Sequence, residues 1–228
     1  MQDALIVIPA KNEAATIATV IAEVRMEAAL RVLLVDDGSS DGTAEIAREA
    51  GAIVLSPPLH LGAWGAIQTG LRYAQEHGYG RVVTLDADGQ HEAKWISDLL
   101  AGLDGGADLV IGAFPERGSR ARHFAWTLFR RLTGLDFADL TSGFRAYNAR
   151  AVALLADEEA TLLDYQDVGV LLLARSANLY IAEVPVQMRQ RANGASRIFS
   201  SWWVVAKYML ETFLLCLAHW NKPARYRS

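Results

Sequence analysis

Two aspartates that follow an apolar run are the residues of this sequence best suited to chemistry. The run 82–85 (VVTL) is rich in β-branched residues and predicts a buried strand, and Asp86 and Asp88 come directly after it. In an open α/β sheet, ligands bind beyond the carboxyl ends of the strands, so we expect both carboxylates in a crevice. With the carbonyl of Gln90 they offer oxygen ligands, which suit Mg2+ or Mn2+ on a diphosphate. The alternative is that the aspartates and Gly89 merely form a turn.

The composition indicates a folded globular chain. The 228 residues are 52% apolar and 21% charged, with no low-complexity tract, which argues against disorder. This length allows one well-buried domain with an appendage. Cys216 is the single cysteine, so an internal disulfide is excluded and a reducing compartment is expected. The first residues lack a basic region followed by a long apolar run, so we expect no signal peptide.

Strands and helices alternate along the first half of the chain. Short apolar runs predict strands at residues 4–8, 32–35, 52–55, 82–85 and 108–111. Helical spacing of apolar residues and capping residues predict helices at residues 13–24, 44–50, 62–77 and 94–103. We expect Pro9 to close the first strand and Asn12 to cap the first helix, whose apolar positions are Ile17, Val20, Ile21 and Val24. This alternation predicts an α/β fold with a mostly parallel, doubly wound sheet and helices on both faces.

Basic residues gather in two segments, although the net charge of the chain is −4. From Pro185 to the end, seven basic residues stand against one acidic residue. The segment 117–135 holds five arginines and no acidic residue, and its apolar positions Phe124, Leu128 and Leu132 repeat at helical spacing. Such segments predict an anionic partner, either phosphate groups or the anionic lipids of a membrane surface. Solvated arginines on a core helix are the alternative.

The segment 198–220 is overwhelmingly apolar and, at helical rise, long enough to cross a bilayer. Lys207 and Glu211 near its centre would each cost about 2.5–3.5 kcal/mol on insertion. We therefore expect a helix that lies in the membrane interface or docks on a partner subunit, with Trp202 and Trp220 near its ends. A spanning helix and burial within a homo-oligomer are the alternatives.

Six motifs occur in an order that resembles the family 2 glycosyltransferases of GT-A fold. They are IPAKNE at 8–13, VDDGSSDGT at 35–43, HLG to GL at 60–71, DADGQH at 86–91, TSGFRAY at 141–147 and the segment 191–196. The resemblance covers residues 5–197. Within the family it is strongest to the polyprenyl-phosphate sugar transferases, the group of dolichol-phosphate mannose synthase. It implies a GT-A domain over residues 1–197, followed by the apolar, basic-flanked helical tail at 198–228.

The resemblance implies a nucleotide-sugar site at the ends of the first strands. Glu13 and one of Asp36 and Asp37 would bind the ribose and base of a UDP- or GDP-sugar, because carboxylates accept hydrogen bonds from hydroxyl and ring N–H groups. The N–H groups at the start of the helix 62–77 would favour the diphosphate, although close helix packing also explains its small residues. The full set is Pro9, Ala10, Asn12, Glu13, Asp36, Asp37, Gly62, Asp86, Ala87 and Asp88, with the metal on Asp86, Asp88 and Gln90.

The resemblance also implies a cationic acceptor site. Two polar residues of the TSGFRAY motif would face the acceptor phosphate or the sugar, and two later arginines resemble a basic loop that closes over the phosphates; these are Ser142, Arg145, Arg191 and Arg197. A guanidinium group binds phosphate oxygens in pairs, and Arg189 is a weaker candidate for the same role. Asp167 would act as a base or bind a sugar hydroxyl, and the alternative is an acid at a helix N-terminus. The residues expected to carry catalysis are Asp88, Asp167 and Arg191.

Three positions depart from the family pattern. His60 stands where relatives often have asparagine, and Ala138 stands where the dolichol-type enzymes tend to have arginine. Gly169 stands where many relatives have a second acidic residue. The absence of an arginine at position 138 concerns the assignment of the acceptor more than that of the donor.

The implied reaction is metal-dependent transfer of a hexose from a nucleotide sugar to a polyprenyl phosphate, with inversion. A lipid phosphate carries ~1.5 or more negative charges at neutral pH, so it can attack without a general base. We expect the enzyme in the cytoplasm, peripheral to the inner face of the membrane, and we expect no nucleic acid partner. Two alternatives stay open. One is a glycosyltransferase with a saccharide or soluble acceptor, and the other is a non-catalytic membrane-associated scaffold that keeps the fold.

Overall fold

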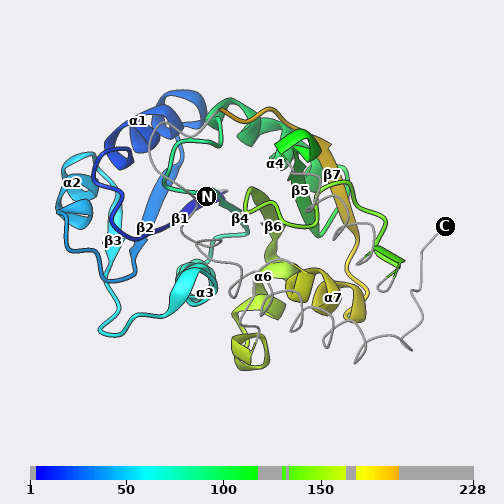
Figure 1. Ribbon diagram of the computed structural model, residues 1–228. Helices are drawn as coiled ribbons and strands as arrows, with labels where there is room; N and C mark the ends of the chain where they lie inside the picture. The colour runs from blue at the N-terminus through cyan, green and yellow to red at the C-terminus, as the bar shows by residue number, and fades with distance from the viewer. Residues whose placement is uncertain (1–3, 118–129, 132–133, 163–167, 190–228) are drawn as a thin grey trace.

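A mixed sheet of seven strands runs through the part of the chain that the computed structural model describes, residues 4–117, 130–131, 134–162 and 168–189 (Figure 1). The strands are β1 (Ala4–Ala10), β2 (Arg31–Asp36), β3 (Ile53–Leu55), β4 (Arg81–Thr84), β5 (Leu109–Ala113), β6 (Arg145–Asn148) and β7 (Ile181–Pro185). Their order across the sheet is β3-β2-β1-β4-β6-β5-β7. Neighbouring strands are parallel except where β6 pairs with β4 and β5. This confirms the predicted α/β fold with a mostly parallel sheet.

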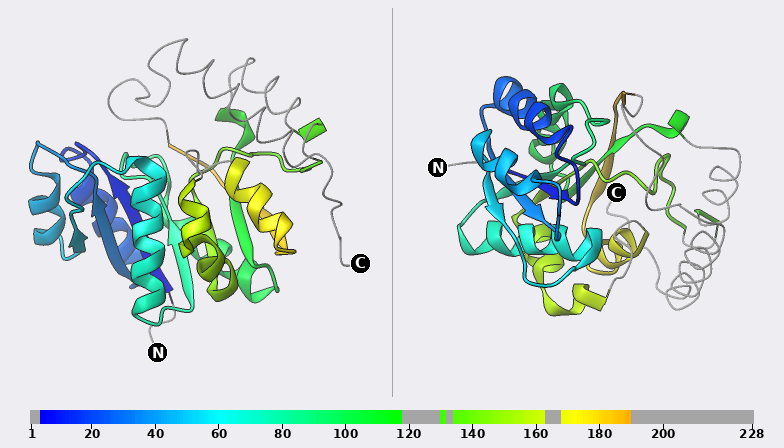
Figure 2. Two further views of the ribbon diagram at one scale, coloured as in Figure 1. Left: turned by 90° about the horizontal axis from the view of Figure 1, so that it is seen from below. Right: turned by 60° about the vertical axis from the view of Figure 1, so that its left-hand side comes forward.

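Helices cover both faces of the sheet. Those described are α1 (Ile17–Ala28), α2 (Thr43–Glu49), α3 (Gly62–Glu76), α4 (Ile96–Asp104), α6 (Ala149–Ala156) and α7 (Val168–Ser176), with the short 3-10 helices η1 (Ala93–Trp95), η2 (Pro115–Arg117) and η3 (Glu158–Leu162). α1, α2 and α4 lie on one face, and α3, α6 and α7 lie on the other (Figure 1, Figure 2). In β1, Leu5 and Val7 pack on the α3 side, and Ile6 and Ile8 pack on the α1 side. A strand buried on both faces has no polar positions, which is why it reads as a continuous apolar run.

Pro9 does not close the first strand, contrary to the expectation. β1 continues beyond it, with Pro9 opposite Val35 of β2. On the other side β4 ends at Thr84, opposite Val7, whose carbonyl accepts the N–H of Leu85. Backbone groups of residues two apart point to the same side of a strand. The nitrogen of Pro9 therefore points to the β4 side, as the backbone groups of Val7 do, but beyond the end of β4. No ladder hydrogen bond is therefore lost at the proline.

Asn12 does not cap the first helix either. α1 begins at Ile17 with Thr16 as its N-cap residue, and Asn12 lies in the preceding loop with a positive φ of 55°. Its side-chain oxygen instead accepts the N–H of Ser40 at 2.8 Å. The bond to a neighbouring loop explains both the backbone conformation and the later helix start. The buried apolar residues of α1 are the predicted ones, Ile17, Val20, Ile21 and Val24.

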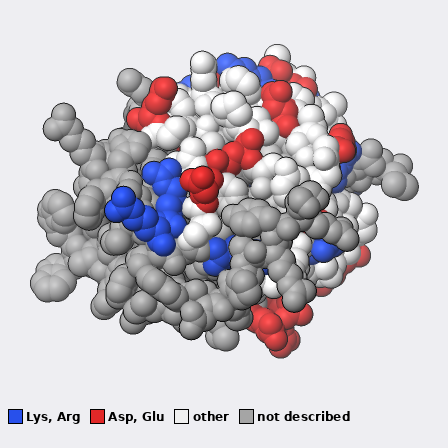
Figure 3. All heavy atoms as spheres, turned by 90° about the vertical axis from the view of Figure 1, so that its right-hand side faces the viewer, with Lys and Arg blue, Asp and Glu red and all other residues white. Residues whose placement is uncertain are grey.

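The side of the molecule that carries β7 shows charges of both signs. Lys and Arg side chains gather there at one place, with Asp and Glu side chains beside them (Figure 3). Two arginines of the segment 117–135 have described side chains, and of these Arg130 is half-buried and Arg131 is exposed. An anionic partner for this segment remains a prediction.

The predicted tail at 198–228 lies outside the described residues, and so do Phe124, Leu128 and Leu132 of the predicted basic helix. The domain boundary at residue 197 and the placement of the tail therefore remain predictions. Among the helices that the structure describes, none combines the length and apolar character that crossing a bilayer requires.

Candidate active site

Hydrogen bonds join the loops that follow β1 and β2 at the carboxyl edge of the sheet. The N–H of Asn12 donates to Ser39 Oγ at 2.8 Å, and the N–H of Glu13 donates to Thr43 Oγ1 at 2.8 Å. Ser39 lies in the loop that follows Asp36, and Thr43 is the first residue of α2 at the end of that loop. The half-buried Glu13 is therefore fixed beside the end of β2, where the predicted nucleotide site lies.

The loop that follows β4 is held to the same edge. Thr16 Oγ1 donates to the carbonyl of the buried Ala87 at 2.8 Å, and Ala87 separates Asp86 from Asp88. Because β1 is parallel to both β2 and β4, the carboxyl ends of these strands meet at one edge. The structure thus brings together the loops that the sequence predicts to bind the nucleotide sugar.

Asp41 supports the junction of the first two loops from the surface. Its carboxylate accepts the N–H of Ala14 at 3.1 Å and a hydrogen bond from the Thr43 hydroxyl. The Thr43 hydroxyl is the main reason why the pKa of Asp41 is lowered below its ordinary value, and the N–H of Ala14 adds to it against an opposing effect of burial. Sequence reasoning gave Asp41 no separate role.

Asp37 is buried and holds the start of α3. Its carboxylate oxygens accept the N–H groups of Leu61 at 2.6 Å and Gly62 at 3.0 Å, and His60 Nδ1 lies 2.6 Å from its Oδ2. A carboxylate at this position satisfies N–H groups that have no partner within the helix and interacts favourably with the helix dipole. The N–H of Gly62, which was predicted to face a diphosphate, donates to the Asp37 carboxylate instead.

Asp36, the other aspartate of the pair, has fewer partners. It is buried, and its Oδ1 accepts the N–H of Ser39 at 3.2 Å. Within the described part of the chain, that is the one hydrogen bond of the Asp36 side chain. Pro9 and Ala10 end β1 beside it, and Ala10 lies opposite Asp36 in the parallel ladder. Asp36 is therefore the aspartate better placed to accept a hydrogen bond from a ligand.

The carboxylate pair lies beyond the end of β4, as the sequence predicts. The N–H of Asp86 donates to Nδ1 of the buried His91 at 3.0 Å. Asp88 Oδ1 accepts the N–H of Gln90 at 3.0 Å, and Gly89 between them has a positive φ of 76°. The backbone after β4 is thus a turn. Forming the turn leaves the Asp86 side chain 42% exposed.

Asp86 and Asp88 suit a divalent cation that a diphosphate also binds. No three His, Cys, Asp or Glu side chains of the described ranges come close enough together to hold a metal by themselves. Mg2+ usually binds one or two carboxylates and completes its coordination with substrate phosphates and waters, so two aspartates fit it. The carbonyl of Gln90, the third predicted ligand, already accepts the N–H of Arg189 at 2.9 Å. Ligation by Gln90 remains a prediction.

Ser142 and Arg145, predicted to face the acceptor phosphate, are both buried. Ser142 Oγ accepts the N–H of Phe144 at 3.3 Å, and Arg145 Nη2 donates to the carbonyl of Leu140 at 3.2 Å. These bonds shape the loop that leads into β6. The phosphate-binding roles of both residues remain predictions.

Two acids that sequence reasoning left unassigned hold the same loop. Asp139 is fully buried, and its carboxylate accepts the N–H groups of Thr141 at 3.0 Å and Phe114 at 3.3 Å. Glu183 of β7 accepts the N–H groups of Ala138 at 2.9 Å and Asp139 at 3.1 Å. No local pattern signals the role of Glu183, because its partners lie 45 and 44 residues earlier.

Arg189 forms ion pairs with acids of other elements. Its Nη1 lies 2.6 Å from Oε1 of Glu23 in α1, and its Nε lies 3.6 Å from Oε2 of Glu92. Glu23 is the main cause that raises the pKa of Arg189 above its ordinary value. An isolated β-bridge pairs His91 with Met188. The chain is therefore attached to the loop after β4 just before the predicted phosphate-binding segment begins.

Three predicted site residues of the later chain lie outside the described residues, namely Asp167, Arg191 and Arg197. Their positions relative to Asp86 and Asp88 remain predictions. The three positions that depart from the family pattern are described. The His60 ring contacts the Asp37 carboxylate, the N–H of Ala138 donates to the Glu183 carboxylate, and Gly169 is buried in α7.

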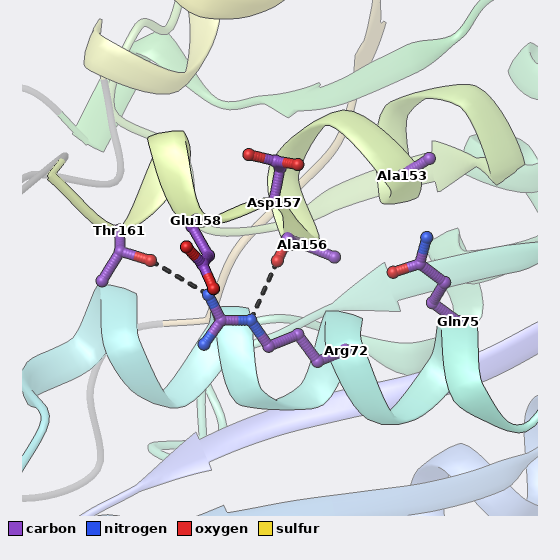
Figure 4. A pocket seen from close by; sticks show the side chains of 7 residues that line it. All are labelled: Arg72, Gln75, Ala153, Ala156, Asp157, Glu158 and Thr161. Atoms are coloured by element: carbon purple, nitrogen blue, oxygen red, sulfur yellow. Dashed lines mark hydrogen bonds between the residues drawn. The ribbon is translucent and has the colours of Figure 1, made fainter.

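A cavity of about 720 Å³ lies between α3, α6 and η3 (Figure 4). Its walls are formed by Arg72, Gln75, Ala153, Ala156, Asp157, Glu158 and Thr161. Arg72 reaches across from α3, donating from Nε to the carbonyl of Ala156 at 2.8 Å and from Nη2 to Thr161 Oγ1 at 3.0 Å. The guanidinium group thus joins two helical segments, and no predicted site residue lines the cavity.

Comparison with protein families and curated proteins gives one consistent family. The model of glycosyl transferase family 2 matches residues 5–153. Polyprenol monophosphomannose synthase of Mycolicibacterium smegmatis is 31% identical over 222 aligned residues, which cover 88% of this chain and 82% of that protein. Undecaprenyl-phosphate mannosyltransferase of Micrococcus luteus is 33% identical over 186 residues, which cover 73% of this chain and 75% of that protein.

Solved structures share the fold. The crystal structure of glucosyl-3-phosphoglycerate synthase from Mycobacterium tuberculosis in complex with Mn2+, uridine diphosphate and phosphoglyceric acid matches with a TM-score of 0.76 at 22% sequence identity, over 98% of this chain and 80% of that chain. This confirms the predicted GT-A fold. The family model covers more than half of the chain, and the chain therefore belongs to glycosyl transferase family 2 and is a glycosyltransferase.

Proposed function

We propose that this glycosyltransferase moves a hexose from a UDP- or GDP-linked sugar to a polyprenyl phosphate, with Mg2+ or Mn2+ on the donor diphosphate and inversion at the anomeric carbon. The observation that carries the proposal is the pair Asp86 and Asp88 beyond β4, attached through Thr16 to the loop that carries Glu13. The names of two relatives, a polyprenol monophosphomannose synthase and an undecaprenyl-phosphate mannosyltransferase, support a lipid phosphate as acceptor.

The donor half assigns the ribose or the base to Asp36. Asp37 accepts the N–H groups of Leu61 and Gly62, so a ligand that used its carboxylate would have to displace the start of α3. The Asp36 carboxylate accepts one hydrogen bond from the described residues, that of the Ser39 N–H, and can accept more. Glu13 comes from the adjacent loop and serves the same part of the nucleotide.

Asp86 and Asp88 would hold the cation against the diphosphate. A divalent cation at this place supplies stabilisation of the negative charge that grows on the departing nucleoside diphosphate. The backbone around the two carboxylates is fixed by His91 at Asp86 and by Thr16 at Ala87. Ligands held in this way are in position before the donor binds, which is the condition for efficient charge stabilisation.

The acceptor half rests on the chemistry of a phosphate monoester. Because a lipid phosphate is already charged at neutral pH, its oxygen attacks the anomeric carbon without a base, and one direct displacement inverts that centre. The proposed ligands of the phosphate remain Ser142, Arg145, Arg191 and Arg197. A lipid acceptor also places the enzyme at the inner face of the membrane, where the basic segments and the apolar tail meet the lipid surface.

Transfer assays test the donor and the acceptor separately. The full chain is incubated with UDP-glucose, UDP-N-acetylglucosamine, UDP-galactose or GDP-mannose, each with polyprenyl phosphate and Mg2+ or Mn2+. We expect one donor to give the glycosylated lipid phosphate. EDTA and the Asp88→Ala variant should each lower turnover by roughly 100-fold or more, because the charge on the leaving group is then no longer neutralised.

The outcomes separate the parts of the proposal. Transfer to a saccharide or another soluble acceptor with no lipid present would show that the acceptor is not a polyprenyl phosphate. Full turnover in EDTA would show that the reaction needs no divalent cation and would contradict that part of the proposal. Analysis of the anomeric configuration of the intact lipid-linked sugar by NMR, compared with that of the donor, checks the inversion.

A further inference from the structure

Gly143 lies against the carboxylate of Asp86. Its carbonyl accepts a hydrogen bond from Thr84 Oγ1 at 2.8 Å, which fixes the residue beside the end of β4. A Cβ atom built on Gly143 would lie 3.0 Å from Asp86 Oδ1 and 3.5 Å from Oδ2. The space that any other residue would fill with its side chain is therefore occupied by the carboxylate.

The backbone of Gly143 gives no other reason for a glycine. Eight described glycines have a positive φ, and Gly143 is not one of them. An alanine could therefore take the same backbone conformation without strain of the kind that left-handed residues suffer. The alanine side chain would, however, force the Asp86 carboxylate to move, because a Cβ atom and a carboxylate oxygen normally stay farther apart than 3.0 Å.

The residue after Gly143 supports Asp86 from a second direction. The Phe144 ring stacks on the ring of His91, with centroids 5.0 Å apart and an angle of 20° between the planes. His91 is buried, and its Nδ1 accepts the N–H of Asp86 at 3.0 Å. One short segment, residues 143–144, thus contacts the carboxylate of Asp86 directly. It also supports the backbone of Asp86 through His91.

We propose that Gly143 is a positioning residue for the divalent cation, because its missing side chain lets the Asp86 carboxylate take the place from which it binds metal together with Asp88. This inference rests on the proposed function, of which the cation is a part. Mg2+ demands nearly ideal octahedral geometry, so a ligand displaced by a few tenths of an ångström binds it less well. Gly143 belongs to the motif predicted to serve the acceptor. The same loop therefore forms a wall of the metal site on the donor side.

The Gly143→Ala variant of the full chain tests the inference through metal binding rather than turnover. Free Mn2+ is measured by electron paramagnetic resonance while the protein is titrated with Mn2+ in the presence of UDP. We expect the Kd for Mn2+ to rise roughly 10-fold or more, as for other residues that orient a metal ligand. The Kd for UDP in EDTA should stay unchanged. The melting temperature should also stay close to that of the wild type, because the Asp86 side chain is 42% exposed and can yield.

Gly80→Ala is the matched control. Gly80 lies just before the opposite end of β4, its φ is not positive, and a Cβ there meets nothing within 4 Å. This variant should bind Mn2+ and UDP as the wild type does. A parallel loss of Mn2+ affinity in both variants would show a general effect on β4 and overturn the inference.

The remaining outcomes distinguish the inference from the function beneath it. If the wild type binds Mn2+ and Gly143→Ala binds it equally well, Gly143 does not position the ligand and the proposed function stands. If Gly143→Ala unfolds, the contact is structural and the inference fails, since it requires the carboxylate alone to move. If the wild type with UDP binds no Mn2+, the cation of the proposed function is absent and both statements fall.

Discussion

Asp36 and Asp37 are adjacent and both buried, yet the structure gives them different partners. Asp37 accepts two N–H groups at the start of α3, from Leu61 and Gly62. Asp36 accepts one, from Ser39 in its own loop. The first residue therefore stabilises the fold, and the second is left with capacity for a ligand.

Substitution of Asp37 should cost stability. We expect Asp37→Ala to lower the free energy of unfolding by about 1–3 kcal/mol, because the N–H groups of Leu61 and Gly62 lose their acceptor. Urea denaturation measures the loss. The matched variant Asp36→Ala should cost less stability and instead weaken UDP or GDP binding in calorimetry. Equal destabilisation by the two variants would contradict the division of roles.

Acid should weaken the junction that Asp41 supports. The Thr43 hydroxyl lowers the pKa of Asp41 from its ordinary value of 3.8 in the folded protein. A carboxylate with a lowered folded pKa contributes stability above its unfolded pKa, and that contribution is lost as the pH falls through the folded pKa. The melting temperature of the wild type should therefore fall below pH 3.8 more steeply than that of Asp41→Asn. Identical slopes in thermal melts would assign the acid sensitivity to other groups.

At the scale of elements, the strands and helices up to β5 follow from the apolar pattern of the sequence, whereas β6 and β7 do not follow from that pattern. Strands buried on both faces can be recognised in the sequence as apolar runs, as β1 and β2 can. β6 has four residues and begins with the buried Arg145, whose side chain donates to the carbonyl of Leu140. β7 is half-buried at the sheet edge. No periodicity signals a strand whose pairing depends on contacts from distant parts of the chain.

The attachment of α3 to α6 and η3 depends on a buried amide. Gln68 Nε2 donates to the carbonyls of Leu155 at 3.1 Å and Asp157 at 2.9 Å, and its Oε1 accepts from the Thr161 hydroxyl at 3.0 Å. Gln68→Leu leaves these groups without their partner, so we expect it to lower the free energy of unfolding by about 1–3 kcal/mol. Gln75→Leu on the same helix is the control, because the Gln75 side chain is exposed. Denaturant titration should show a loss in the first variant and little change in the second.

At the scale of the whole molecule, parallel topology is what made the site predictable. The carboxyl ends of β1, β2 and β4 meet at one edge, so the loops that carry Glu13, Asp36 and the aspartates after β4 are expected at that edge, and hydrogen bonds join these loops there. The sequence could not tell which aspartate of the pair after β2 holds α3. Nor could it reveal the contact between Gly143 and Asp86, since that contact depends on where β6 enters the sheet.

Three consecutive N–H groups, those of Asn12, Glu13 and Ala14, donate to side-chain oxygens of the loop after β2 and of the first residue of α2, and not to the backbone of a strand or helix. Their protons can reach solvent when the two loops part, without any strand of the sheet having to separate. In deuterium oxide the three amides should therefore exchange as one cooperative unit, faster than the amides of β1 and slower than those of a loop without partners. A nucleotide that bridges Glu13 and Asp36 would keep the loops together, so exchange mass spectrometry of this peptide would report donor binding before any sugar is transferred.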